Sequence, residues 1–327
     1  MNLLRRKFLH LTTGAVALPA MTRIASGQAY PVRTITLIVP FPPGGSTDPV
    51  GRIMAARMAE KLGQPVIVEN IGGAGGSIGV GRLAHAVPDG YTIDIGQWDT
   101  HVLNGIVYNL NYDLRTDFTP IGLVSLNPVL LVARKAFPAD DLKALVAWMK
   151  AHPGEARFGN GSAATRLGGF LLENLSGAKM LFVPYRGAGP AMTDLIAGQI
   201  DLLVVQAAGG MPQVRAGTIK ALANLSAHRS EAIPSVPSSD ESGLPGLYMA
   251  SWFGLFAPKG APKDAVAKIN AAMVQTLAQP DVRKKIIDLG LDVAPPEQQT
   301  PDGFAAFYKA EIAKWWPMVK AAGITAQ

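Results

Sequence analysis

The chain has 327 residues, 48% hydrophobic and 17% charged, a composition typical of a soluble globular protein long enough for two domains. It contains no cysteine, which excludes disulfides, thiolate catalysis and cysteine-ligated metals. No apolar run reaches the length that crosses a bilayer, so we expect no integral membrane segment in the mature protein.

Residues 1–29 have the pattern of an export signal. Arg5-Arg6-Lys7 precedes an apolar stretch, and small residues follow up to Ala29, where a signal peptidase would cleave. The paired arginines resemble a twin-arginine leader, although a Sec leader has similar parts. We therefore expect a signal peptide over residues 1–29, cleaved near Ala29. Its removal takes away four positive charges and lowers the formal net charge from +6 to +2, which leaves no basic surface that would indicate nucleic-acid binding.

A glycine-rich loop joins the first predicted strand, residues 34–39, to the first predicted helix, residues 50–62. The strand is β-branched and apolar with little alternation, as in a parallel strand covered on both faces. In the loop, glycines permit close backbone approach and three polar residues can cap the helix: Gly44, Gly45, Ser46, Thr47 and Asp48. Free N–H groups and the helix dipole would attract a carboxylate or phosphate here. Taken alone, however, the pattern favours a tight turn with a helix cap.

The same unit of strand, loop and helix is then repeated. Residues 64–69 predict a second strand, residues 70–79 a second glycine-rich turn, and residues 80–86 a helix. Residues 92–96 predict a third strand, which is followed by Gln97-Trp98-Asp99-Thr100-His101. This repetition predicts a parallel sheet whose loops gather at the carboxyl ends of its strands.

A second set of elements follows an apolar stretch over residues 119–133 that is suited to pass between domains. Helices are expected at residues 141–150, 167–175 and 191–198, and strands at 156–160, 180–185, 200–205 and 219–224. Residues 251–257 predict a return crossing, and three helices without intervening strands complete the chain at 263–277, 281–289 and 301–319. The sequence thus predicts two α/β lobes joined by two crossing strands, with lobe 1 formed by residues 30–128 and 254–327, and lobe 2 by residues 129–253. The default ligand site in such an architecture is the cleft between the lobes.

Several motifs suggest chemistry, and each is weak. Gly75-Gly-Ser77-Ile-Gly79 matches the nucleophile elbow of a serine hydrolase, but no histidine lies in a recognisable triad setting. Residues 159–164 resemble a dinucleotide fingerprint, yet the acidic Glu173 falls on the following helix rather than after the next strand. No His or carboxylate spacing indicates a metal site. We therefore expect no metal and no cofactor, and keep a hydrolase that uses Ser77 as an alternative.

Three side chains have both a structural and a functional interpretation. Phe41 and Trp98 are compatible with core packing, but their places beside strand-end loops are equally suited to contact a ligand. Arg166 lies at a predicted helix start, where the dipole disfavours a cation. A bound carboxylate would offset that cost, which moderately favours the functional interpretation.

Five ordered motifs resemble the Bug family, the extracytoplasmic solute receptors of tripartite tricarboxylate transporters. They are Phe-Pro-Pro-Gly-Gly-Ser-Thr-Asp-Pro-Val-Gly-Arg at 41–52, Val-Glu-Asn-Ile-Gly-Gly-Ala-Gly-Gly-Ser-Ile-Gly at 68–79, Pro-Asp-Gly-Tyr-Thr at 88–92, Asp-Phe-Thr-Pro-Ile at 117–121 and Val-Pro-Tyr-Arg-Gly at 183–187. The resemblance covers essentially the whole mature chain. It implies a type II periplasmic-binding fold that closes around a small organic acid, two integral-membrane transporter subunits as partners, a monomeric receptor and no enzyme activity.

The resemblance also implies which residues hold the ligand carboxylate. In the first lobe these are Phe41, Gly44, Gly45, Ser46, Thr47 and Asp48, with Trp98 as a ligand-facing candidate. The opposite lobe would contribute Gly161, Ser162, Thr165 and Arg166, with Tyr185, Arg186 and Gly187 nearby. The glycines at 73–76 match the family equally well and are expected to shape the cleft.

Two departures from the family pattern suggest the ligand class. Many relatives have His where this chain has Arg166, and the third strand usually ends in residues smaller than Gln97-Trp98-Asp99. A permanent cation can hold a second carboxylate with two hydrogen bonds, and Trp98 can narrow the cleft or stack on a ring. We therefore expect a dicarboxylate or an aromatic carboxylate. A sensor that presents its closed form to a signalling partner is a further alternative to transport.

Overall fold

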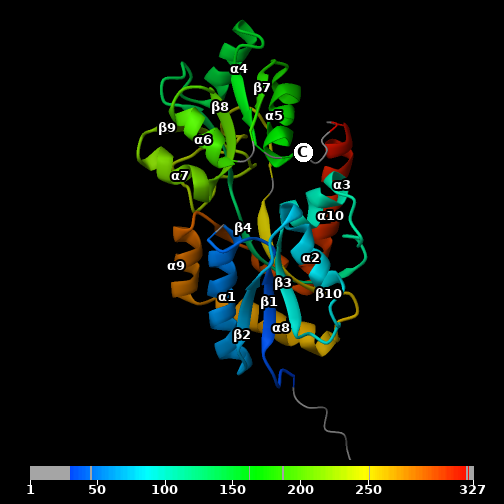
Figure 1. Cartoon of the computed structure of the whole chain (residues 1–327). Helices are drawn as coiled ribbons and strands as arrows, with labels where there is room; N and C mark the ends of the chain where they lie inside the picture. Colours follow the sequence, from blue (N-terminus) through cyan, green and yellow to red (C-terminus); the bar gives the residue numbers. More distant parts are fainter. Residues whose placement is uncertain are drawn as a thin grey trace, which may run out of the picture.

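The computed structural model describes residues 30–44, 46–161, 163–185, 188–249, 251–321 and 323. The expected signal peptide lies outside these residues. Within them, none of the helices combines the length and the apolar character needed to cross a bilayer. Figure 1 shows two α/β lobes stacked one above the other, with β4 and β10 in the lower lobe near the passages between them.

The first lobe is built on a mixed sheet. Its strand order is β11 (Asp292–Val293), β4 (Phe118–Leu126), β10 (Trp252–Pro258), β3 (Thr92–Gln97), β1 (Ile35–Val39) and β2 (Val66–Asn70). β1 is parallel to β2 and β3, as the repeated unit predicts. β10 is antiparallel to both β3 and β4, because it re-enters this lobe from the second one. The sequence did not predict the short strand β11.

Helices from both ends of the chain cover this sheet. They are α1 (Thr47–Leu62), α2 (Ser77–Ala84), α3 (Asn104–Val107), α8 (Lys263–Leu277), α9 (Pro280–Asp288) and α10 (Pro301–Ala321), with short turns η1 (Ala74–Gly76), η2 (Asp99–Leu103) and η3 (Pro296–Gln299). Met54 and Met58 of α1 and Ile269 and Met273 of α8 are fully buried in one apolar cluster with the sheet. The three C-terminal helices therefore pack back on the first lobe, as Figure 1 shows.

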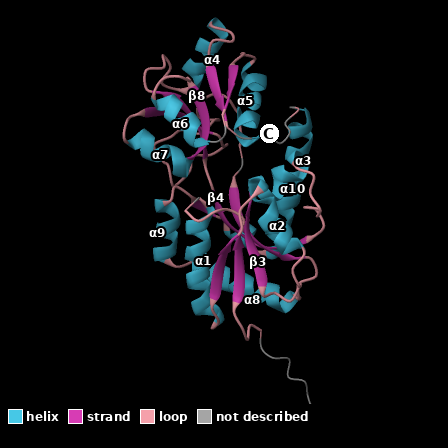
Figure 2. Ribbon diagram, in the orientation of Figure 1, coloured by secondary structure: helices cyan, strands magenta, loops and turns pink. Residues whose placement is uncertain are grey.

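The second lobe has a five-stranded sheet. Its order is β7 (Leu181–Pro184), β6 (Arg157–Asn160), β8 (Leu202–Gln206), β5 (Val129–Arg134) and β9 (Ile219–Asn224). The packed helices are α4 (Leu142–Ala151), α5 (Ala163–Ser176), α6 (Ala188–Ile196) and α7 (Ala207–Arg215) (Figure 2). β6 is parallel to β7 and β8, whereas β5 is antiparallel to β8 and β9. α5 begins four residues before the predicted start at residue 167.

The chain passes between the sheets twice. The first passage, Asn127-Pro128, is direct, because β4 ends at Leu126 and β5 begins at Val129. The return runs from the end of β9 to β10, whose first residue lies two positions before the predicted lobe boundary at 253/254. Exact lobe boundaries stay predictions.

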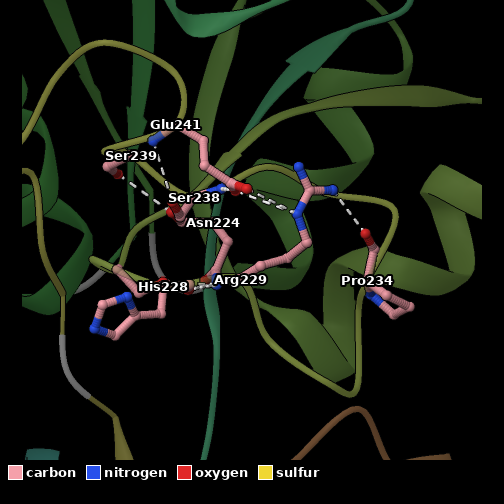
Figure 3. Close-up of polar contacts among 8 residues, drawn as sticks. Asn224, His228, Arg229, Pro234, Ser238, Ser239 and Glu241 are labelled. Carbon is pink, nitrogen blue, oxygen red and sulfur yellow. Dashed lines mark hydrogen bonds and ion pairs between the residues drawn. The ribbon is translucent and has the colours of Figure 1, made fainter.

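Polar contacts order the long return segment (Figure 3). Arg229 forms an ion pair with Glu241 at 3.2 Å and donates a hydrogen bond to the carbonyl of Pro234 at 2.7 Å. Glu241 accepts from the backbone N–H of Ser238 at 2.7 Å, and the Ser239 hydroxyl donates to the carbonyl of Leu247 at 2.8 Å. These contacts fix the path of a connection that lacks regular structure.

Candidate functional site

A cleft of about 980 Å³ lies where the strand-end loops of the two lobes meet. The first lobe contributes residues that follow β1 and β3, among them Phe41, Ser46, Gln97, Trp98, Asp99 and Asn104, together with Gly75 of the glycine-rich turn. The second lobe contributes residues at the ends of β6, β7 and β8 and the first turn of α5, among them Asn160, Gly161, Thr165, Arg166, Tyr185 and Gln206. The cleft thus lies at the carboxyl ends of parallel strands in both lobes, where such folds place ligands.

The Asp48 side chain stabilises the loop after β1 through hydrogen bonds. Its carboxylate accepts hydrogen bonds from the backbone N–H of Gly44 at 3.1 Å, from Arg52 Nε at 3.0 Å and from Asn70 Nδ2 at 2.9 Å. The Arg52 hydrogen bond is the main cause that lowers the pKa of Asp48. Asp48 therefore stays ionised and accepts the hydrogen bond of the Gly44 N–H, so this N–H is not available to a ligand.

This arrangement refines the prediction for the first loop. Phe41 and Ser46 line the cleft, but Gly44, Thr47 and Asp48 do not. Thr47 and Asp48 are buried, and their side chains bond within the first lobe. Their polar atoms are hydrogen-bonded to other residues of the first lobe, so they stabilise the loop rather than face the cleft. Gly45 lies outside the described residues.

The residues after β3 form a hydrogen-bonded chain that reaches the cleft. The Thr47 hydroxyl donates to Gln97 Oε1 at 3.0 Å, and Gln97 Nε2 donates to Asp99 Oδ2 at 3.3 Å. Asp99 is half-buried and lines the cleft, and burial raises the pKa of its carboxyl to about 6. A carboxyl group is therefore one of the functional groups of this wall.

Trp98 belongs both to the core and to the cleft. It is 1% exposed, its ring meets the edge of Trp315 with centroids 5.1 Å apart, and it also lines the cleft. Its buried indole N–H has no hydrogen-bond partner among the described residues. The two interpretations of Trp98 are thus compatible, because one face of the side chain packs while another part borders the ligand space.

The glycine-rich turn shapes this wall, as the sequence suggested. Gly76 has φ +90°, and a Cβ at this position would lie 2.5 Å from Thr100 Cγ2, so a larger residue would displace the β3 loop. The carbonyl of Gly75 accepts a hydrogen bond from Asn104 Nδ2 at 2.9 Å. Backbone shape and the Asn104 amide together fix the turn against η2.

Ser77 does not have the surroundings of a catalytic nucleophile. Asn104 Nδ2 donates to its hydroxyl at 3.1 Å, and within the described part of the chain no histidine is hydrogen-bonded to it. His85 Nδ1 is bonded to the carbonyl of Gly81 in its own helix, and His101 is fully buried against Phe256. A general base in contact with the nucleophile, which a hydrolase requires, is missing from these contacts.

The second lobe provides a wall with mixed chemistry. Gly161 donates its N–H to Thr165 Oγ1 at 3.0 Å, which closes the turn before α5. Arg166 lies in the first turn of this helix, exposed, and lines the cleft. Tyr185 donates its hydroxyl to Asp194 at 2.7 Å, and burial together with this hydrogen bond raises its pKa to about 12. Ser162, Arg186 and Gly187 lie outside the described residues.

Sequence reasoning missed several polar groups of the cleft. Asn160, at the end of β6, is buried, and its side-chain carbonyl has no hydrogen-bond partner among the described residues. Gln206, at the end of β8, donates to the Ser251 hydroxyl at 3.2 Å beside the return crossing. Asp99 and Asn104 complete this set. Asn160, Gln206 and Asp99 end or closely follow predicted strands, so a polar residue at a strand's carboxyl end was the available signal for these three, whereas Asn104 begins α3 and had no such signal.

Apart from two side chains of opposite charge, the cleft residues that the structure describes are neutral. Among the described lining residues, Arg166 carries the positive charge and Asp99 is the acidic group. Arg166 is therefore placed to bind an anion from the second lobe. In the described part of the chain, no group of three or more His, Cys, Asp or Glu side chains is arranged to hold a metal ion.

Comparisons with known proteins agree with this geometry. Residues 50–324 match the family model for the tripartite tricarboxylate transporter family receptor, TctC. MatC of Rhodopseudomonas palustris, solved with bound malate, is 40% identical with a TM-score of 0.75, over 89% of this chain and 100% of that one. A second R. palustris structure, with adipate, is 32% identical with a TM-score of 0.78, over 91% of this chain and 100% of that one.

A curated relative extends the match at the level of sequence. Protein BugT of Bordetella pertussis is 34% identical over 321 residues, which cover 96% of this chain and 95% of the relative. The family model, the relatives and the two-lobed structure with its cleft all agree with the resemblance that the five motifs carry. The chain therefore belongs to the Bug, or TctC, family of periplasmic solute receptors of tripartite tricarboxylate transporters.

Proposed function

We propose that this protein captures a small organic dicarboxylate or aromatic carboxylate in the periplasm and delivers it to the two membrane subunits of a tripartite tricarboxylate transporter. The observation that carries the proposal is the cleft between the lobes, with Arg166 on one wall and a loop at the start of α1 on the other. The malate and adipate in two similar structures are both dicarboxylates, which supports the diacid. Residues 1–29 would export the chain, and the receptor would act as a monomer without catalysis.

Ligand binding would favour closure because the ligand contacts both lobes at once when they meet. A ligand shifts a conformational equilibrium by the difference in its affinity for the two states. The first lobe contributes Phe41, Ser46 and Trp98, and the second contributes Arg166 and Tyr185. A ligand bound to a single lobe would therefore lose the contacts that the other lobe offers. The closed form would then be the one that the membrane subunits bind.

Arg166→Ala tests the role of the cation. Isothermal titration calorimetry would compare two diacids with monoacids of equal length: succinate with butyrate, and adipate with hexanoate. We expect the variant to lose affinity for the diacids about tenfold or more, since a charged bidentate contact is removed, and to lose less for the monoacids.

The matched control is Arg215→Ala, which removes an exposed arginine at the end of α7, outside the lining residues. It should bind as the wild type does. Equal losses for mono- and diacids, or no loss, would contradict the diacid assignment. An absence of binding by every acid to the wild-type protein would contradict the receptor function itself.

A further inference from the structure

Asp99 places a carboxyl group on the cleft wall opposite Arg166. It is the first residue of η2, directly after Trp98, and it lines the cleft while most of its surface is buried. Within the described part of the chain, no cationic side chain lies within 4.0 Å of this carboxylate, although Arg166 lines the same cleft. An acidic group on the wall of a site for anions is unexpected and calls for a ligand-side partner.

The hydrogen bonds to Asp99 from the described residues fix the orientation of its carboxylate but do not use all of its acceptor sites. The Thr47 hydroxyl donates to the side-chain oxygen Oε1 of Gln97, and this contact orients the Gln97 amide so that its NH₂ group points at Asp99. Gln97 Nε2 donates to one carboxylate oxygen at 3.3 Å, which is a long hydrogen bond. Besides the backbone N–H of Asp99 itself, Gln97 is the donor to this carboxylate among the described residues. Because an ionised carboxylate has about four acceptor sites, it can accept a further hydrogen bond from a donor in the cleft.

Lobe closure would remove the Asp99 carboxylate from water, and this costs free energy if its remaining acceptor sites have no hydrogen-bond donor. Removing a charged carboxylate from water without hydrogen-bond partners is unfavourable, and burial already raises the pKa of Asp99 to about 6. A ligand that brings an N–H or O–H group to Asp99 would offset the cost, whereas a ligand with a second carboxylate at this place would meet a like charge. The arrangement therefore distinguishes ligands by the donor that they carry.

We propose that Asp99 is a specificity-determining residue, and that the ligand is a carboxylate that also carries a hydroxyl or ammonium donor, with its acid group toward Arg166 and its donor toward Asp99. This inference rests on the proposed receptor function and names its substrate class more closely. A hydroxyl and an ammonium group can both donate a hydrogen bond to Asp99, and the experiment distinguishes ligands that carry one from ligands that carry the other.

The test compares wild type with Asp99→Asn in two series of acids that share a skeleton within each series: succinate, malate and aspartate, and phenylacetate, mandelate and phenylglycine. Calorimetry is done at pH 8, where Asp99 is ionised. Of the residues that the structure describes, the other charged or titratable groups that face the cleft are Arg166 on α5, Tyr108 after α3 and Tyr185 after β7, while Asp94 and His101 are buried in the first lobe. Tyr185, with a pKa of about 12, does not titrate near this pH.

In the wild type, we expect a donor-bearing acid to bind about tenfold or more tightly than the unsubstituted acid of its series. Asp99→Asn keeps the shape and an acceptor for Gln97, so the unliganded Tm should stay close to that of the wild type. In Asp99→Asn, the preference for the donor-bearing acid over the unsubstituted acid should fall below about threefold, chiefly because the donor-bearing acid binds more weakly than it does to the wild type. Tighter binding of malate or mandelate identifies the hydroxyl, and of aspartate or phenylglycine the ammonium group.

Asp288→Asn is the matched control, because it removes one exposed negative charge on α9, outside the cleft lining. It should keep the wild-type preference. Binding of acids without a preference for the donor, or a preference that Asp99→Asn leaves intact, would overturn the inference while leaving the receptor function standing. Failure of every acid to bind the wild type would overturn both.

Discussion

Asp94 and His101 are two fully buried titratable residues behind the loop that carries Trp98 and Asp99. His101 Nε2 lies 3.6 Å from Asp94 Oδ2, and His101 Nδ1 is hydrogen-bonded to the Thr100 hydroxyl at 2.9 Å. Neither carboxyl oxygen of Asp94 has a hydrogen-bond partner among the described residues. Burial raises the pKa of Asp94 well above its usual range and lowers the pKa of His101 to about 3. Burial therefore favours the uncharged form of both side chains in the folded protein.

This burial predicts a pH dependence of stability that Asp94→Asn removes. The folded protein keeps a proton on Asp94 that the unfolded chain releases above about pH 4, so stability falls as pH rises toward the folded pKa. In urea unfolding at a series of pH values above about 4, we expect the stability of the variant relative to wild type to increase with pH until the folded pKa of Asp94 is passed. The neutral state of His101 contributes stability above pH 6.5 that is lost toward pH 3, but both proteins share this contribution. Parallel stability curves would show that Asp94 is ionised when folded.

At the scale of elements, one carboxylate ties three strands of the second lobe together. Asp201 precedes β8, is 6% exposed at its side chain, and forms ion pairs with Arg134 at the end of β5 at 2.7 Å and Arg157 at the start of β6 at 2.9 Å. It also accepts from the backbone N–H of Arg157 at 2.9 Å. These contacts lie at the end of the sheet opposite the cleft, so they hold the strands in register without reaching the ligand.

Asp201→Asn should therefore destabilise the protein without changing its cleft. The Asp201 side chain is buried but Arg134 and Arg157 are partly exposed, so solvent compensates part of the lost attraction. We expect a loss of about 2 kcal/mol in the free energy of unfolding, measured with urea. Asp140→Asn, which breaks a pair between Lys220 and a 91% exposed side chain, should have little effect. Ligand affinity measured by calorimetry should stay at the wild-type value. A small loss at Asp201, equal to that of the control, would contradict this account.

At the scale of the whole molecule, a polar contact joins the lobes beside the crossings. Asp292 lies in β11 of the first sheet, and its carboxylate accepts from the Ser230 hydroxyl and from the backbone N–H of Ala232, both at 2.9 Å. Ser230 and Ala232 belong to the return segment that follows β9. This contact therefore favours the arrangement of the lobes in which the cleft is assembled.

Asp292→Ala should weaken ligand binding although it touches no part of the cleft. If the assembled arrangement is less populated, the apparent Kd rises in proportion, and we expect a rise of about threefold to tenfold. Small-angle X-ray scattering should show a larger radius of gyration for the unliganded variant than for the wild type, and a saturating acid should restore the wild-type value. An unchanged Kd would show that this contact does not influence the lobe arrangement.

The two-lobed architecture can be predicted from the amino-acid sequence. Alternating strands, glycine-rich loops and helices predict two α/β lobes, because buried parallel strands and amphipathic helices each have their own residue period. The five ordered motifs led to the family. Positions beside strand ends suggested Phe41 and Trp98 as ligand contacts, a helix start suggested Arg166, and the resemblance to the family added Ser46 and Thr165. All five line the cleft.

Which of the described loop residues line the cleft depends on contacts between distant parts of the chain. Asp48 turns away to hold its own loop, and Thr47 bonds to Gln97, which is 50 residues further along the chain. Asp99 and Asn160 become groups of the cleft because strands from different lobes bring them there. A hydrogen-bond partner and the degree of burial depend on residues that are distant in sequence, and local patterns carry no record of them.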